Sequence, residues 1–231
     1  MKILRIFRLI ALAGGAVLIL QSDFWKIGRV DCRQNENPCS SEIWTELTSL
    51  TFGKNIIFFP TDKVKREILR EKPTLKEVKI KKKLPNKLIF ELKEREGIVA
   101  LGLEGGEDFY IVDSEGVLLT KAKESNLPLI LLSQPIGLDI GQRVEEEEIL
   151  RAINFLTNLR LNLFEPKLAR IISPFSGEVL VKGDVTLLFS LKKEAQIQLD
   201  SLQLIFSRSK IEGKTIRKID LRFDKPVLTY E

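Results

Sequence analysis

Two cysteines are the most reactive side chains in this chain of 231 residues. Cys32 and Cys39 enclose a short polar segment, Arg-Gln-Asn-Glu-Asn-Pro. If this region lies outside the cytoplasm, the spacing favours a disulfide across the loop. Two unpaired structural thiols are the second interpretation. A metal site is the third and least favoured interpretation, because no second ligand pair with suitable spacing accompanies the cysteines. A disulfide would brace the fold locally, by roughly 2–3 kcal/mol in the chain-entropy model.

Catalytic chemistry is poorly supported by the remaining residue types. The sequence has no histidine, which removes the usual general base at neutral pH and excludes Ser-His-Asp and Cys-His hydrolases. We interpret the four glutamates at 145–148 as the solvated start of a helix rather than a metal or acid–base cluster. Asp113 and Glu115 flank a turn, where a turn-capping aspartate is favoured over a catalytic pair. With neither a glycine-rich phosphate loop nor a Gly-x-Ser-x-Gly elbow, we expect no enzyme and no cofactor.

Basic residues gather between Lys76 and Lys87, and the net charge of the chain is +5. The lysines alternate with aliphatic rather than aromatic residues, which is typical of a solvated sheet face. Contact with anionic lipid headgroups or wall polymer is the alternative. Export from the cytoplasm would separate them from nucleic acid, so no nucleic-acid partner is expected.

The amino-terminal segment indicates the compartment. Its apolar stretch runs from Leu9 to Leu20 and contains only apolar residues and glycine. Arg5 and Arg8 precede this stretch and Asp23 follows it. By the positive-inside rule, the amino terminus should be cytoplasmic and the rest of the chain extracytoplasmic. Residues 3–22 amount to about 20 residues, enough to span a bilayer if the arginines reach the interface.

We therefore predict a single uncleaved transmembrane anchor, with Trp25 placed as its interfacial residue. A cleaved signal peptide is the alternative, although Leu20 is a poor residue for the outer position of a cleavage site. A buried core helix is the third interpretation, and the basic residues before the stretch argue against it.

The exported part shows two patterns in succession, and together they predict an α+β protein. Residues 24–96 follow the order strand, helix, helix, strand, strand, so the helices should cover one face of a small sheet. Ser40 or Ser41 should cap the first helix, with Ile43, Leu47 and Leu50 on its buried face. The predicted elements are a strand at 27–30, helices between 41 and 53 and between 61 and 72, and strands around 78–82 and 88–92.

Residues 97–231 are richer in short strands and should form a mixed, β-rich domain with two helices. The helices are expected at 144–161 and 194–206, with buried stripes at Ile149, Ile153, Leu156 and Leu159, and at Leu199, Leu202 and Ile205 or Phe206. The expected strands are 99–103, 109–112, 117–119, 129–132, 169–172, 178–182, 186–191, 218–223 and 227–230.

Several segments, in order, resemble the FtsQ/DivIB cell-division family. The chain departs from the family's pattern at Gly97, where the family usually has proline after Glu-Arg. The matching segments are Trp-Lys-Ile-Gly-Arg-Val at 25–30, Gly-Lys-Asn-Ile-Ile at 53–57, Leu-Pro-Asn-Lys-Leu at 84–88, Glu-Arg at 94–95, Val-Ala at 99–100, Tyr-Ile-Val-Asp-Ser-Glu-Gly-Val at 110–117, Leu-Pro-Leu-Ile at 127–130, and Ile-Asp-Leu-Arg-Phe at 219–223.

The resemblance implies a tail and anchor at residues 1–23, a POTRA domain at 24–96 and the family's β-rich domain at 97–231. It implies a non-catalytic scaffold in the bacterial cell membrane, at the division septum. The expected partners are FtsB/DivIC-like and FtsL-like proteins. The family's FtsB contact, carried onto this chain, falls on Asp220, Leu221, Arg222, Pro226, Val227, Leu228, Thr229 and Tyr230.

Two other functions remain open from the sequence. A POTRA-containing component of a protein translocation system is one, and an exported wall-modifying enzyme is the other. The helical patterns within residues 144–206 argue against a translocation barrel, which needs many alternating strands.

Overall fold

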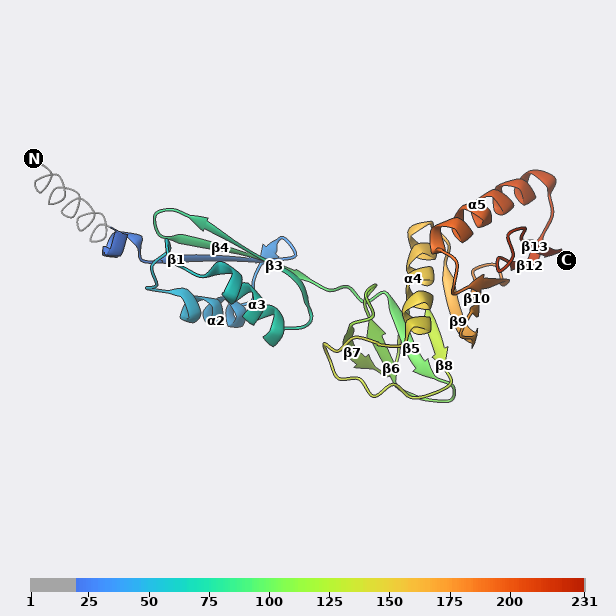
Figure 1. Ribbon diagram of the computed structural model, residues 1–231, viewed down its shortest axis with the longest axis horizontal. Helices are drawn as coiled ribbons and strands as arrows, with labels where there is room; N and C mark the ends of the chain where they lie inside the picture. Colours follow the sequence, from blue (N-terminus) through green and yellow to red (C-terminus); the bar gives the residue numbers. More distant parts are fainter. Residues whose placement is uncertain (1–19, 231) are drawn as a thin grey trace, which may run out of the picture. The chain divides into compact units, whose positions relative to one another are not determined.

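The computed structural model describes residues 20–230, and the chain divides into two compact units, Met1–Glu94 and Arg95–Glu231 (Figure 1). Within residues 20–230, no helix is long and apolar enough to cross a membrane. Most of the predicted anchor, including Arg5, Arg8 and Leu9, lies outside the described residues, which begin at Leu20. We call the two parts unit 1 and unit 2.

Unit 1 contains a four-stranded mixed sheet in the order β2-β1-β4-β3. β1 runs parallel to β4, and β3 runs antiparallel to it. The predicted order of strand, helix, helix, strand and strand is found, with the short β2 as an addition. The elements are the 3-10 helix η1 (Asp23–Trp25), β1 (Arg29–Gln34), β2 (Asn37–Pro38), α2 (Ser41–Thr51), α3 (Thr61–Glu71), β3 (Leu75–Lys83) and β4 (Lys87–Glu94).

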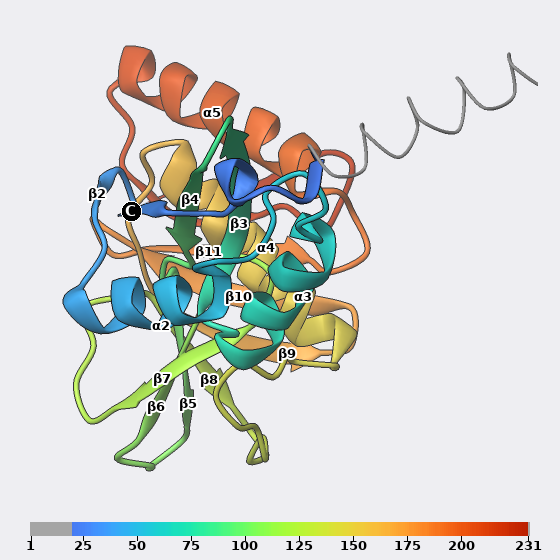
Figure 2. The ribbon, with the colours of Figure 1, turned by 90° about the vertical axis from the view of Figure 1, so that its left-hand side faces the viewer.

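Helices α2 and α3 lie side by side on one face of this sheet (Figure 2). Ser40 caps α2, since its hydroxyl accepts a hydrogen bond from the Ile43 amide at 3.4 Å. Leu47 and Thr51 are the buried residues of α2, whereas the prediction that Leu50 would be buried is wrong. The buried positions follow a spacing of four residues, and this turns Leu50 toward solvent.

Unit 2 contains a nine-stranded sheet in the order β13-β12-β11-β10-β9-β8-β5-β6-β7. Most neighbours are antiparallel, but β5–β8, β8–β9 and β11–β12 are parallel. The elements are β5 (Val99–Leu103), β6 (Phe109–Val112), β7 (Leu118–Ala122), β8 (Leu129–Leu132), α4 (Glu147–Leu161), β9 (Pro166–Ser173), β10 (Ser176–Val181), β11 (Val185–Ser190), α5 (Ala195–Glu212), β12 (Ile216–Asp220) and β13 (Val227–Tyr230).

The core of unit 2 lies where α4 and α5 pack on this sheet. Phe155 of α4 stacks on Phe189 of β11, with ring centroids 4.2 Å apart. All four predicted positions of the α4 stripe are buried. The predicted start of this helix at residue 144 is wrong, because the Val144 amide bonds instead to the Gly116 carbonyl at 2.9 Å. The end predicted for the second helix at 206 is also wrong: α5 continues until Gly213, whose φ of +65° terminates it.

Candidate partner-binding edge

The last strand, β13, lies at the edge of the nine-stranded sheet (Figure 1). It pairs antiparallel with β12, with Val227 opposite Asp220 and Tyr230 opposite Ile216. Within residues 20–230, no strand covers its other side. Alternate backbone N–H and C=O groups of such a strand point away from the sheet and can pair with an added strand.

The side chains of β13 divide between the core and solvent. Leu228 packs partly buried against the core of unit 2, which fixes the strand to the sheet. Val227 and Tyr230 are 56% and 40% exposed. The Lys214 ammonium lies over the Tyr230 ring, 5.4 Å from its centroid, and this contact holds the ring at the sheet surface.

The three predicted residues before β13 form its support. The Leu221 side chain is buried in the core, and its amide bonds to the Leu188 carbonyl at 2.8 Å. Arg222 donates two hydrogen bonds to the Asp220 carboxylate, from Nε at 2.9 Å and from Nη2 at 2.6 Å. These bonds lower the pKa of Asp220 and raise that of Arg222. The pair therefore fixes the turn that leads to β13, and each of the two charges neutralises the other.

Sequence reasoning missed two features of this turn. Phe223 is 56% exposed and stands between β12 and β13. The Asp224 carboxylate pairs with the Lys193 ammonium at 2.7 Å, and this bond lowers the pKa of Asp224. The available signal for Phe223 was an aromatic residue directly after Asp-Leu-Arg in the sequence. Phe223, Val227 and Tyr230 thus form the exposed apolar side chains of the edge.

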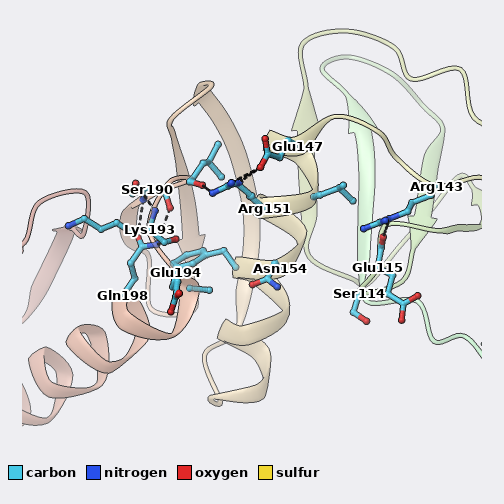
Figure 3. A pocket seen from close by; sticks show the side chains of 14 residues that line it. Ser114, Glu115, Arg143, Glu147, Arg151, Asn154, Ser190, Lys193, Glu194 and Gln198 are labelled. Carbon is cyan, nitrogen blue, oxygen red and sulfur yellow. Dashed lines mark hydrogen bonds and ion pairs between the residues drawn. The ribbon is translucent and has the colours of Figure 1, made fainter.

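A cavity of about 320 Å³ lies between α4 and the start of α5 (Figure 3). Three of its charged residues, Arg143, Glu147 and Arg151, are engaged with one another or with the backbone. Arg151 bonds to Glu147 at 2.5 Å and to the Leu191 carbonyl at 2.7 Å, and Arg143 bonds to the Glu115 carbonyl at 2.8 Å. These contacts are structural, and we assign no chemistry to the cavity. Within residues 20–230, no group of three or more acidic or cysteine side chains could hold a metal.

Asp113 caps its turn, as the sequence indicated. Its Oδ1 accepts from the amides of Glu115 at 2.9 Å and Val117 at 2.8 Å, and the residue is 2% exposed. Its Oδ2 accepts from Arg95 at 2.5 Å, an ion pair that sequence reasoning did not find. Burial acts to lower the pKa of Arg95, but hydrogen bonds to Glu115 and Asp113 outweigh it and raise that pKa overall. This cluster is therefore a buried structural ion pair.

In unit 1, a disulfide joins Cys32 to Cys39, whose Cα atoms are 5.4 Å apart. It links β1 to the segment just after β2, where the Cys39 amide also bonds to the Cys32 carbonyl at 3.2 Å. Trp25 packs partly buried against the core of unit 1, while its neighbour Phe24 is 64% exposed. The role of Trp25 as an interfacial anchor stays a prediction.

Comparison with known proteins gives one family model and several curated relatives, each of which matches part of the chain. Residues 29–95 match the family model described as POTRA domain, FtsQ-type. The Cell division protein DivIB of Clostridium botulinum (strain Loch Maree) is 36% identical over 116 residues, which cover 50% of this chain and 44% of that protein. The DivIB of Clostridium tetani is 26% identical over 147 residues, covering 62% and 53%. The chain thus spans about half the length of the curated relatives it matches.

Proposed function

We propose that this chain is a member of the FtsQ/DivIB family and a non-catalytic scaffold of the bacterial division machinery. Its amino-terminal segment would hold it in the cell membrane, with both units on the extracytoplasmic side. The lack of histidine and the structural role of the charged residues in the unit 2 cavity support a binding rather than a catalytic role.

The proposed binding mode is strand addition to β13 by the extracytoplasmic part of an FtsB/DivIC-like protein. The observation that carries it is the place of β13 at the edge of the sheet. An added strand would pair with the outward backbone groups, and adjacent side chains would supply specificity. Tyr230 is the best anchor of the edge, since aromatic residues commonly dominate such interfaces. An FtsL-like protein would join through this partner.

Pro226 supports the same geometry. It has no N–H to donate, so it is compatible with an edge strand and unfavourable in a central one. The residue is half-buried and directly precedes Val227, where pairing with β12 begins. The missing N–H of Pro226 therefore falls just before the paired residues. A partner strand could pair with β13 without losing a hydrogen bond there.

The test is a titration of the full-length protein, reconstituted in nanodiscs, with the extracytoplasmic part of its FtsB/DivIC-like partner. Truncation after Asp224 removes β13 and should abolish binding. Tyr230→Ala should weaken it by about tenfold, or about 1.4 kcal/mol. Phe175→Ala is the matched control, because Phe175 is 57% exposed in unit 2 and also lies under a lysine, Lys192, at 3.8 Å.

An unchanged affinity for the truncated and still folded protein would overturn the assignment. The search would then move to unit 1. Retained binding by Tyr230→Ala with lost binding by the truncation would keep the strand and reject the tyrosine as its anchor.

The proposed topology has its own measurement. The intact mass of protein purified from washed membranes should include the first residues of the chain. A mature start near Asp23 would show instead that the amino-terminal segment is a cleaved signal peptide.

A further inference from the structure

One end of unit 1 is built from three segments that are far apart in the sequence. The segment from Trp25 to Ile27 pairs with the loop after α2: the amide of Ile27 bonds to the Lys54 carbonyl, and the amide of Ile56 to the Trp25 carbonyl. The turn between β3 and β4 joins them, because the amide of Gly28 bonds to the Asn86 carbonyl at 2.9 Å. We call this the entry end, since the chain enters unit 1 here (Figure 1).

The entry end exposes large apolar side chains from all three segments. Phe24 is 64% exposed, Phe52 62%, Phe58 64% and Leu84 56%. The neighbouring Trp25 is partly buried and meets the Phe24 ring edge-on at 5.1 Å, so Trp25 supports the more exposed ring. Several exposed aromatic residues on one end of a small domain indicate a surface that contacts something apolar.

Lysines accompany these apolar side chains. Lys54, Lys82 and Lys83 are exposed, and Lys82 reaches across to the Ile57 carbonyl at 3.0 Å. The side chains of Lys54 and Lys83 have no partner among residues 20–230. An anionic membrane surface offers an acyl boundary for exposed aromatic side chains and phosphates for unpaired lysines. The side chains of the entry end match both layers.

The carboxylates near this end leave the positive charge uncompensated. Asp23 pairs with Lys26 at 2.7 Å, and Asp31 pairs with Lys87. Asp62 lies in the first turn of α3, where it favours the positive end of that helix. The charge presented by Lys54, Lys82 and Lys83 is therefore left for an external anion.

The position of Leu20 orients this end. Its carbonyl accepts a hydrogen bond from the Asn55 side chain at 2.6 Å, in the loop that carries Phe52 and Phe58. In the sequence, Leu20 is the last residue of the apolar stretch that starts at Leu9. The exposed apolar side chains thus lie beside the point at which this apolar stretch, part of the anchor predicted over residues 3–22, joins the unit.

We propose that the entry end of unit 1 rests on an anionic lipid bilayer. Phe24, Phe52, Phe58 and Leu84 would enter the boundary between headgroups and acyl chains, while the three lysines contact lipid phosphates. The inference rests on the membrane anchor of the proposed function and is independent of the partner site on β13. It gives unit 1 a function of its own, which is to fix its orientation on the membrane.

Quenching of tryptophan fluorescence by brominated lipid acyl chains tests the contact. The full-length protein carrying Phe58→Trp is reconstituted in vesicles of phosphatidylglycerol and phosphatidylcholine, and the signal is compared with that of the parent. Brominated acyl chains should reduce the fluorescence of the added tryptophan at least twofold. Phe175→Trp in unit 2 is the reporter control and should retain its fluorescence.

Charge reversal tests the lipid class. In the Phe58→Trp protein, a triple change to glutamate at Lys54, Lys82 and Lys83 should weaken the lipid contact. It should restore at least half of the fluorescence lost to the brominated chains. Reversal of Arg33, Lys79 and Lys93, which lie toward the other end of the same sheet, makes the same change in charge and should restore none. Each variant is first checked for folding by circular dichroism.

The outcomes separate the inference from the proposed function. Equal fluorescence of the Phe58→Trp protein in brominated and unbrominated vesicles overturns the lipid contact, even when the protein floats with the vesicles and binds its partner. Equal quenching in pure phosphatidylcholine overturns the requirement for anionic lipid. Failure of the protein to float with vesicles refutes the anchor itself.

Discussion

The two units protect the edges of their sheets in different ways. In unit 1, β2 has two residues, and the opposite edge strand, β3, has the sequence LKEVKIKKK. Short edges and lysine-rich edges both discourage pairing with another chain. In unit 2, β13 has the sequence VLTY and carries no charged side chain. The comparison supports the proposal that a partner adds its strand to unit 2 rather than to unit 1.

The cores differ as well. Unit 1 has a small core closed by two helices, and a disulfide braces the loop between β1 and β2. Unit 2 has a larger core around the stacked Phe155 and Phe189, and the buried Asp113–Arg95 pair fixes its first strands. Small cores gain more from a covalent brace, because they bury less apolar surface per residue.

The largest expected effect is on the buried ion pair of unit 2. Asp113→Ala should destabilise unit 2 by about 3 kcal/mol, because it leaves the Arg95 guanidinium with a single carboxylate and two turn amides without an acceptor. Calorimetry of the full-length protein should show a lower unfolding temperature for unit 2 and an unchanged unfolding temperature for unit 1. Glu165→Ala is the control, since Glu165 forms an exposed pair with Lys182. A parallel shift of both transitions would contradict the separation of the two cores.

The next effect falls on unit 1. Replacing Cys32 and Cys39 together by serine should destabilise unit 1 by about 2 kcal/mol, since the loop that the disulfide closes is short. Partner binding at β13 should not change. Thiol labelling of the exported protein before and after reduction gives the redox state directly, and full labelling without reductant would show that the bond does not form.

Much of this comparison was available from the sequence. Alternation in Leu88, Phe90 and Leu92 predicted β4, and all three residues are buried. Val227–Tyr230 was predicted with the observed bounds. Periodicity is reliable where one face of an element is buried, and β4 meets that condition.

Long-range contacts were not available. Arg95 and Asp113 are 18 residues apart, and nothing in the local pattern pairs them. The same holds for the entry end of unit 1, where Phe24, Phe52 and Leu84 come together only through backbone pairing of three segments. The prediction that Leu50 is buried was wrong for a related reason. Helical spacing gives the apolar face of α2, but the sheet beneath the helix decides which side of that face is covered.

The difference between the edges can be tested by making one edge resemble the other. Val227→Lys with Thr229→Lys gives β13 the charges of β3 and should weaken partner binding about tenfold, or about 1.4 kcal/mol. Both side chains are exposed, so the stability of unit 2 should stay within about 0.5 kcal/mol. The titration used for Tyr230→Ala measures the effect. Unchanged affinity with both lysines present would show that charge on β13 does not control binding.

The smallest expected effect concerns two ion pairs that stand at these edges. Arg222 lowers the pKa of Asp220 in the turn before β13, and Lys81 lowers the pKa of Glu91 across β3 and β4. The Asp220 side chain is 13% exposed, whereas Glu91 is more exposed, at 36%. Screening by solvent is therefore weaker at Asp220, and its pair should contribute more.

The sign of the pH dependence follows from the direction of the shift. A carboxyl whose pKa is lower in the folded protein stabilises it above the unfolded pKa, about 3.9 for aspartate, and loses that contribution as the pH falls through the folded value. Asp220→Asn should therefore lower the stability of unit 2 at pH 7 by up to about 1 kcal/mol, and the difference from the parent should shrink below pH 4. Glu91→Gln should leave unit 1 nearly unchanged at every pH. Thermal unfolding of both variants from pH 7 to pH 3 measures this, and an Asp220→Asn deficit that persists undiminished at pH 3 would show that the pair acts through packing rather than charge.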